Sequence, residues 1–125
     1  MMANASFRDL KVWQTSMTLA ESVYATTATF PRDERFGLTA QLRRAVVSIA
    51  SNIAEGKRRK RERVFLHHLD IALGSQAEVE VQLEIATRVG FLRDADYQRL
   101  DALTGEVGRM LNGLITSMRP HDSDA

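Results

Sequence analysis

The amino-acid sequence predicts an all-α protein in which four helices form one bundle. It also indicates that copies of this bundle assemble into an oligomer. Apolar residues recur three and four positions apart in four separate stretches, which is the spacing of one helix face. No stretch alternates apolar and polar residues between turn residues, as a half-buried strand does. The second and third stretches carry more apolar surface than one core of this size covers. This surplus favours a subunit interface, and tight packing of small residues within a monomer is the alternative.

Length and composition describe a single domain, residues 1–125, with a modest core. Hydrophobic residues make up 44% and charged residues 26% of the chain, ordinary values for a globular protein. The chain has no cysteine, which excludes a disulfide framework and a zinc site made of thiolates. The first residues lack the pattern of a signal peptide, and no apolar stretch reaches the roughly 18 residues that span a bilayer. We therefore expect a soluble, cytoplasmic protein with no membrane contact and no cofactor.

The first two helices are predicted by apolar stripes with helical spacing. The main stripe of the first helix is Leu10, Trp13, Met17, Ala20 and Tyr24, and Val12, Leu19 and Val23 add a second apolar line. The core stripe of the second helix is Leu42, Val46, Ile49 and Ile53.

The third expected helix carries two apolar stripes, and the fourth carries one. Gly74, Ser75 and Ala77 lie in the middle of the third helix, where glycine costs about 1 kcal/mol relative to alanine. Close approach of another helix would account for these small residues. The second stripe of the third helix is Val64, Ile71, Ile85 and Val89.

Glycine and proline residues mark the ends of the expected helices. Gly56 is well placed to follow the second helix in a left-handed conformation, and Gly90 stops the third. Pro31 and Pro120 lie where a helix pattern has ended, and the acidic tail 120–125 is expected to be disordered. The expected helices span about residues 8–27, 38–55, 60–88 and 95–118.

A narrow polar stripe follows one side of the second helix at intervals of three, four, four and three. It is either a solvated face, a buried network that fixes helix register, or the polar groove of an enzyme. Glu78 and Glu80 of the third helix are candidate partners for Arg43 or Arg44. The stripe is Gln41, Arg44, Ser48, Asn52 and Glu55.

A dense run of cations follows the second expected helix. Of the seven residues 57–63, six are cationic and one is acidic, a charge of +5, whereas the other residues hold eleven cations and fifteen acids, a charge of −4. Cations after a helix C-terminus are favoured by the helix dipole, but cations at the start of the next helix are disfavoured. The unfavourable placement of cations at the start of the third helix suggests that they bind an anionic partner. The alternative is a solvated turn. The candidate nucleic-acid-binding residues are Lys57, Arg58, Arg59, Lys60, Arg61 and Arg63, helped by Arg43 and Arg44 if these are exposed.

The histidines do not indicate a metal site. His67 and His68 are adjacent, so they point about 100° apart on a helix, and neither has a further ligand four residues on. Asp70 suits a salt bridge with His67 instead. No phosphate-binding loop or catalytic triad is evident either, which favours a protein that is not an enzyme.

Three stretches of the chain resemble the family of small four-helix bundle proteins named after the intervening sequences of 23S ribosomal RNA genes. They are FRDLKVWQTSMTLAESVY, FPRDERFGLTAQLRRAVVSIASNIAEGKRR and FLHHLDIALGSQAEVEVQLEIATRVGFL. The resemblance runs from Phe7 to about Ile115, and residues 36–56 and 74–83 are its most specific parts. It implies an up-down-up-down bundle, assembly as a ring-shaped homopentamer, and an association with 23S rRNA. The chain is also similar to the accessory proteins of diversity-generating retroelements, which are basic pentameric bundles that work with a reverse transcriptase and its RNA.

Three functions are compatible with these observations. The first is a homo-oligomeric module that binds RNA, another nucleic acid or a nucleoprotein complex through the basic run. Few aromatic residues occur and none is interleaved with this run, so phosphate contacts without base recognition are expected. The second is a protein-interaction scaffold for an acidic protein. The third is an enzyme whose site lies between subunits and uses the polar stripe with Glu78 and Glu80.

Overall fold

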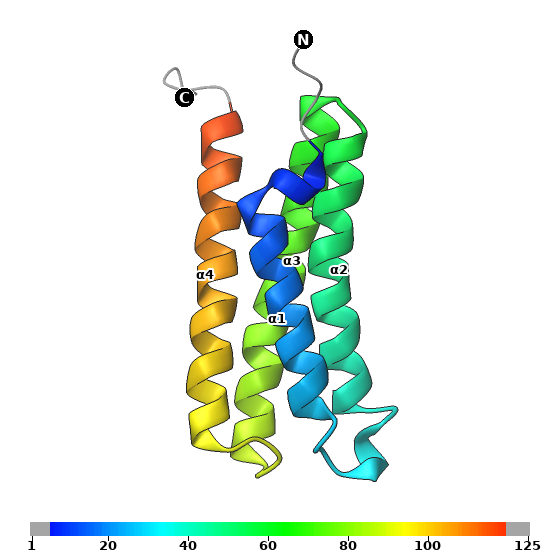
Figure 1. Cartoon of the computed structure of the whole chain (residues 1–125), viewed down its shortest axis with the longest axis vertical. Helices are drawn as coiled ribbons and strands as arrows, with labels where there is room; N and C mark the ends of the chain where they lie inside the picture. Colours follow the sequence, from blue (N-terminus) through cyan, green and yellow to red (C-terminus); the bar gives the residue numbers. More distant parts are fainter. Residues whose placement is uncertain (1–5, 120–125) are drawn as a thin grey trace.

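The computed structural model describes residues 6–119, and four long helices account for most of them (Figure 1). No strand occurs in this part of the chain, so the expected all-α class is confirmed. The expected disorder of the tail 120–125 concerns residues outside the described range. The elements are η1 (Phe7–Asp9), α1 (Lys11–Thr27), η2 (Arg32–Glu34), α2 (Leu38–Arg58), α3 (Glu62–Arg88) and α4 (Asp94–Met118), of which η1 and η2 are short 3₁₀ turns.

The four helices lie side by side around one core, and each packs against two of the others. The pair α2 and α3 shares the largest contact, and the pair α1 and α4 the smallest. Figure 1 shows the start of α1, the turn between α2 and α3 and the end of α4 together at the upper end of the bundle. The connections between α1 and α2 and between α3 and α4 lie at the lower end.

Large aliphatic side chains fill the core, and burying each of them contributes roughly 1.5–3 kcal/mol. The core stripe expected for α2 is confirmed, because all four of its residues are fully buried. The stripe expected for α1 is wrong in part, since Met17 and Tyr24 are exposed and Val12, Leu19 and Val23 face the core instead. Both faces of α1 are apolar, so periodicity alone could not select the buried one. None of the described helices has the length and apolar character needed to cross a bilayer.

Gly56 lies inside α2 and does not end it, contrary to the expectation from sequence. The helix continues to Arg58, and α3 begins at Glu62 rather than near residue 60. The reason for the glycine is the close approach of α3. A Cβ atom at position 56 would lie 2.7 Å from the Cβ of His68 and 3.0 Å from Cδ1 of Phe65.

We expect Gly56→Ala to lower the free energy of unfolding by about 1–3 kcal/mol, because the added methyl forces α2 and α3 apart. Gly113→Ala is the matched control, since a Cβ at this helical position has no atom within 4 Å. It is expected to raise stability by up to about 1 kcal/mol through helix propensity alone. Urea unfolding of both variants measures the difference, and equal effects would contradict close helix contact at Gly56.

Candidate nucleic-acid interface

The basic run forms the turn between α2 and α3. Lys57 and Arg58 end α2, where the helix dipole favours cations. Arg59 remains helical at φ −70° and ψ −19°, and its N–H donates to the carbonyl of Gly56 at 3.2 Å. Lys60 then adopts a left-handed conformation with φ 62°, and the extended Arg61 precedes the first residue of α3. The turn therefore reverses the chain within two residues and keeps every cation of the run at one end of the bundle.

Lys60 holds the backbone conformation that glycine adopts most readily, which costs a side-chain-bearing residue about 1–2 kcal/mol. We expect Lys60→Gly to raise the free energy of unfolding by about 1 kcal/mol for this reason. Arg59→Gly, next to it, should lower stability by a similar amount because Arg59 is helical. Thermal unfolding at several salt concentrations compares the two variants. A stability loss in Lys60→Gly would contradict strain at this position.

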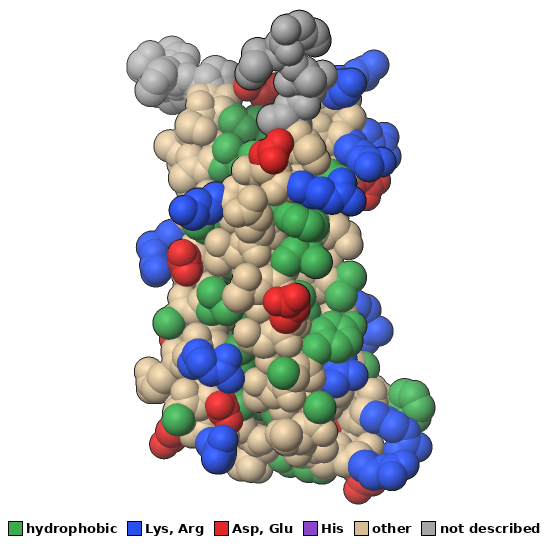
Figure 2. All heavy atoms as spheres, in the orientation of Figure 1, with side chains coloured by type: hydrophobic (Ala, Val, Ile, Leu, Met, Phe, Trp, Pro, Cys, Tyr) green, Lys and Arg blue, Asp and Glu red, His purple; other side chains and the backbone are tan. Residues whose placement is uncertain are grey.

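The cations of the run are exposed to solvent, and few of them pair with acidic side chains of the protein. All six are exposed except Lys57, which is half-buried. Arg59 pairs with Glu55 at 3.0 Å, but both side chains are more than half exposed, so this pair contributes at most about 1 kcal/mol. Within the described residues, the other five cations form no ion pair. Figure 2 shows cationic side chains gathered over the upper end of α2.

Two aromatic residues lie at the basic run, which the sequence reasoning missed. The guanidinium carbon of Arg58 lies 5.6 Å from the centre of the Phe7 ring, and Lys57 Nζ lies 5.8 Å from that of Phe65. No aromatic residue is interleaved with residues 57–63, as expected, but these two rings lie near the cations from outside the run. Phe7 comes from η1, far from the run in the sequence, and no local pattern signals its position.

Arg43 and Arg44 lie away from the basic run. They precede Lys57 by 13 or more residues on the same helix, a separation of roughly 20 Å. Arg43 binds α1: its Nε donates to Thr27 Oγ1 at 2.9 Å, and its guanidinium carbon lies 4.5 Å from the ring centre of Tyr24. Arg44 is exposed. Neither arginine pairs with Glu78 or Glu80 among the described residues, so the expected pairing is wrong.

The centre of the polar stripe is a hydrogen-bonded network between α2 and α3. Ser75 Oγ donates to Ser48 Oγ at 2.8 Å, and Asn52 Nδ2 donates to the Ser48 carbonyl at 2.9 Å. His68 Nδ1 lies 2.9 Å from Asn52 Oδ1 and donates to it, because the amide nitrogen of Asn52 is already turned to Ser48. The network fixes the register of the two helices, as one of the sequence-based interpretations proposed. The stripe ends in solvent, because Gln41, Arg44 and Glu55 are exposed.

The carboxylates suggested for a catalytic groove do not come together. Glu55 and Glu78 lie on opposite sides of the Ser48–Ser75 contact, roughly 15 Å apart along the bundle. Glu78 and Glu80 point about 160° apart around α3. Glu80 faces α4, where the pKa of Tyr97 is raised by burial and by the carboxylates of Asp101, Glu84 and Glu80.

No group of three or more metal-binding side chains occurs within residues 6–119. His67 and His68 lie with their ring centres 5.8 Å apart. Asp70 accepts from Arg119 at 3.0 Å, across to the end of α4, so the expected salt bridge with His67 is wrong.

Comparison with known proteins agrees with this architecture. Residues 8–113 match the family described as 23S rRNA-intervening sequence protein. A solved structure, a protein of unknown function from the S23 ribosomal protein family of Bacteroides thetaiotaomicron VPI-5482, is similar with a TM-score of 0.75. The two are 24% identical, and the similarity covers 83% of this chain and 97% of the other, so it shows a shared fold. No curated protein matches the chain. With the family match extending over most of its length, the chain belongs to the 23S rRNA-intervening sequence protein family.

Proposed function

We propose that the protein is a homo-oligomeric, cytoplasmic module that binds RNA or another nucleic acid and catalyses no reaction. The observation that carries this proposal is the group of six cations at the α2–α3 turn, of which one forms an ion pair within the described residues. We call this group the basic cluster: Lys57, Arg58, Arg59, Lys60, Arg61 and Arg63. The family name supports RNA, specifically 23S rRNA, as the partner.

Phosphate contacts account for the affinity that such a cluster provides. Each contact releases condensed counterions, so the binding constant falls as salt rises. If the basic cluster meets about six phosphates of a single strand, log K falls with log[salt] at a slope near −4. A single protomer then binds without reading base sequence, and an oligomer repeats the cluster and gains from multivalency.

Fluorescence-anisotropy titration tests the proposal. Labelled single-stranded RNA and duplex DNA are titrated with the protein at several salt concentrations from about 50 to 300 mM. We expect binding at low salt with the steep slope given above. No binding of either nucleic acid at 50 mM salt would refute the proposal.

We further propose that up-down-up-down bundles of this chain assemble into a ring, a homopentamer. Two apolar surfaces on different sides of the bundle support this assembly. One is a groove of about 450 Å³ between α1 and α2, lined by Met17, Tyr24 and Val47 among others. The second is the exposed side of α3, where Val81 is 59% and Val89 55% exposed. Two unlike surfaces on one protomer suit head-to-tail contacts, which close into rings.

The alternative function is a scaffold that holds a protein partner, an acidic one where the basic cluster makes the contact. Phe36 favours a protein contact, because its side chain is 83% exposed beside Arg35 in the loop between α1 and α2. Exposed aromatic and arginine residues are the usual anchors of protein interfaces. This function predicts that changing the basic cluster abolishes capture of the protein partner, while nucleic-acid binding is negligible throughout.

A further inference from the structure

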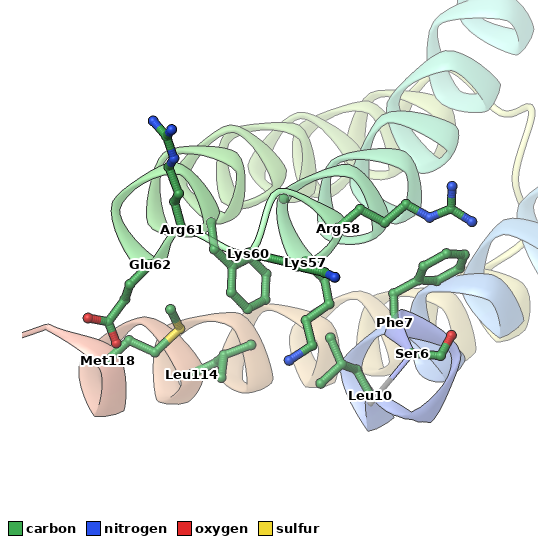
Figure 3. A pocket seen from close by; sticks show the side chains of 12 residues that line it. Ser6, Phe7, Leu10, Lys57, Arg58, Lys60, Arg61, Glu62, Leu114 and Met118 are labelled. Atoms are coloured by element: carbon green, nitrogen blue, oxygen red, sulfur yellow. The ribbon is translucent and has the colours of Figure 1, made fainter. Parts of the chain in front are cut away.

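A cavity of about 830 Å³ opens beside the basic cluster, at the end of the bundle where η1, α2, α3 and α4 meet (Figure 3). Its size is within the range of small-molecule and cofactor sites, roughly 300–1,000 Å³. One part of its lining is apolar and comes from η1, the residue after it, α3 and α4: Phe7, Leu10, Phe65, Leu114 and Met118. Another part is mainly cationic, with Lys57 and Arg58 from the end of α2 and Lys60 and Arg61 from the turn that follows. The carboxylate of Glu62, the first residue of α3, also lines the cavity. Figure 3 shows Lys57 extending toward the space between Leu10 and Leu114, and Glu62 beside Met118.

Phe7 is held in place before any ligand arrives. Ser6 Oγ accepts from the N–H of Arg8 at 3.1 Å, and the Ser6 N–H donates to Asp9 Oδ2 at 3.2 Å, which fixes the turn η1. The ring of Phe7 packs edge-on against Trp13 with 5.1 Å between ring centres. An apolar residue fixed in this way offers a surface for stacking at little entropic cost.

The apolar and cationic parts of the lining together suit a ligand that has a flat apolar group and several negative charges. A phosphate or an acidic side chain alone would leave the apolar lining in contact with water. A paired base is enclosed in its duplex, whereas an unpaired base can stack on aromatic rings and on arginine planes while its phosphates meet cations.

We propose that this cavity receives one unpaired nucleotide of a single-stranded nucleic acid, with the base against Phe7 and Leu114 and the adjoining phosphates on Lys57, Arg58 and Lys60. The inference rests on the proposed nucleic-acid binding and adds a preference for single strands. Arg59 and Arg63 do not line the cavity and contact phosphates further along the strand.

The test compares a 12-nucleotide single strand with a blunt duplex of the same sequence, each titrated with the wild-type protein, Phe7→Ala, Leu114→Gln and Leu103→Gln. Leu103 is the matched control, because it is a half-buried leucine of α4 that does not line the cavity. Stacking of one base contributes about 1–3 kcal/mol, so Phe7→Ala should weaken single-strand binding about 5- to 150-fold. Leu114→Gln should weaken it as well. Duplex affinity should stay within about twofold for both variants, and Leu103→Gln should leave both affinities unchanged.

A second readout follows the base directly. A strand with 2-aminopurine at one position should change its fluorescence on binding the wild-type protein and lose this change with Leu114→Gln. Single-strand binding that survives both cavity variants would overturn the inference and leave the proposed function intact, because phosphate contacts alone would explain it. No binding of either nucleic acid by the wild-type protein would overturn the proposed function itself. Displacement of the strand by micromolar uridine 5′-monophosphate would identify a free nucleotide as the ligand instead of a strand.

Discussion

Replacing the six cations of the basic cluster with glutamine is expected to weaken binding of single-stranded RNA at least about 1,000-fold at 0.1 M salt. Each phosphate contact with a single strand contributes about a fivefold change in affinity for every tenfold change in salt, and six contacts multiply. The salt dependence should fall with the affinity, from a slope near −4 to a slope near zero. Fluorescence anisotropy over a salt series measures both quantities.

The control for this variant removes the same charge from other parts of the surface. Six exposed arginines outside the basic cluster serve this purpose: Arg32, Arg35, Arg88, Arg93, Arg99 and Arg109. Changing them to glutamine should reduce affinity less than about tenfold, because surface charges further away than about 10 Å are largely screened at 0.1 M salt. Equal losses in the two variants would mean that overall charge, and not the basic cluster, attracts the nucleic acid. Circular dichroism and light scattering confirm that both variants fold and assemble alike.

The basic cluster could be predicted from sequence because its members are consecutive. Six cations within seven residues remain together in any fold, and a turn between two helices exposes them. The cavity beside the cluster could not be predicted in this way. Its apolar lining joins Phe7 near the start of the described residues to Leu114 and Met118 near their end, and only the packing of the bundle brings them together.

Gly56 shows a different limit of sequence reasoning. A glycine before a basic run has the pattern of a helix end, and that interpretation was wrong. Gly56 allows α2 to pack closely against His68 and Phe65 of α3. The sequence pattern of one helix contains no information about such a contact between two helices. Lys60, which does adopt the left-handed conformation at this helix end, has no side-chain feature that predicts it.

The small residues at the centre of α3 lie on a side of the helix that could contact a second copy of the chain. A Cβ at Gly74 would have no atom within 4 Å, so no helix of the same chain approaches it closely. The close helix contact expected from sequence is therefore absent at Gly74 among the described residues, although Ser75 is buried against α2. Gly74 lies on the same side of α3 as Ile71, Val81 and Ile85, which are all exposed. A second copy of the chain that packs on this side would explain both the glycine and the apolar residues.

If the proposed ring forms, Val81→Asp combined with Ile85→Asp is expected to convert it into monomers. Both side chains are exposed in the single chain, at 59% and 45%, so the fold of the monomer should tolerate the change. An interface that covers them would have to bury two unpaired carboxylates, at a cost of several kcal/mol in each contact. Multi-angle light scattering should report the 14.0 kDa of one chain, against about 70 kDa for a closed pentamer.

A variant with two aspartates on another exposed surface is the control. Gln98→Asp with Ala102→Asp adds two carboxylates one helical turn apart on α4, outside both apolar surfaces. This variant should keep the mass of the wild-type protein. Loss of assembly in both variants would indicate repulsion between acidic chains, and a wild-type protein of 14.0 kDa at micromolar concentration would refute the proposed ring.

Mixing two monomeric variants distinguishes a head-to-tail contact from a symmetric one. Val47→Asp changes the groove between α1 and α2, where Val47 is 45% exposed, and leaves α3 intact. If the groove of one protomer binds α3 of the next, each variant alone is monomeric, and the mixture forms a dimer through one intact groove and one intact α3. If α3 binds α3 by a two-fold axis, Val47→Asp alone still forms dimers through that contact. A heterodimer of about 28 kDa in the mixture, absent from either variant alone, would support the head-to-tail contact that a ring requires.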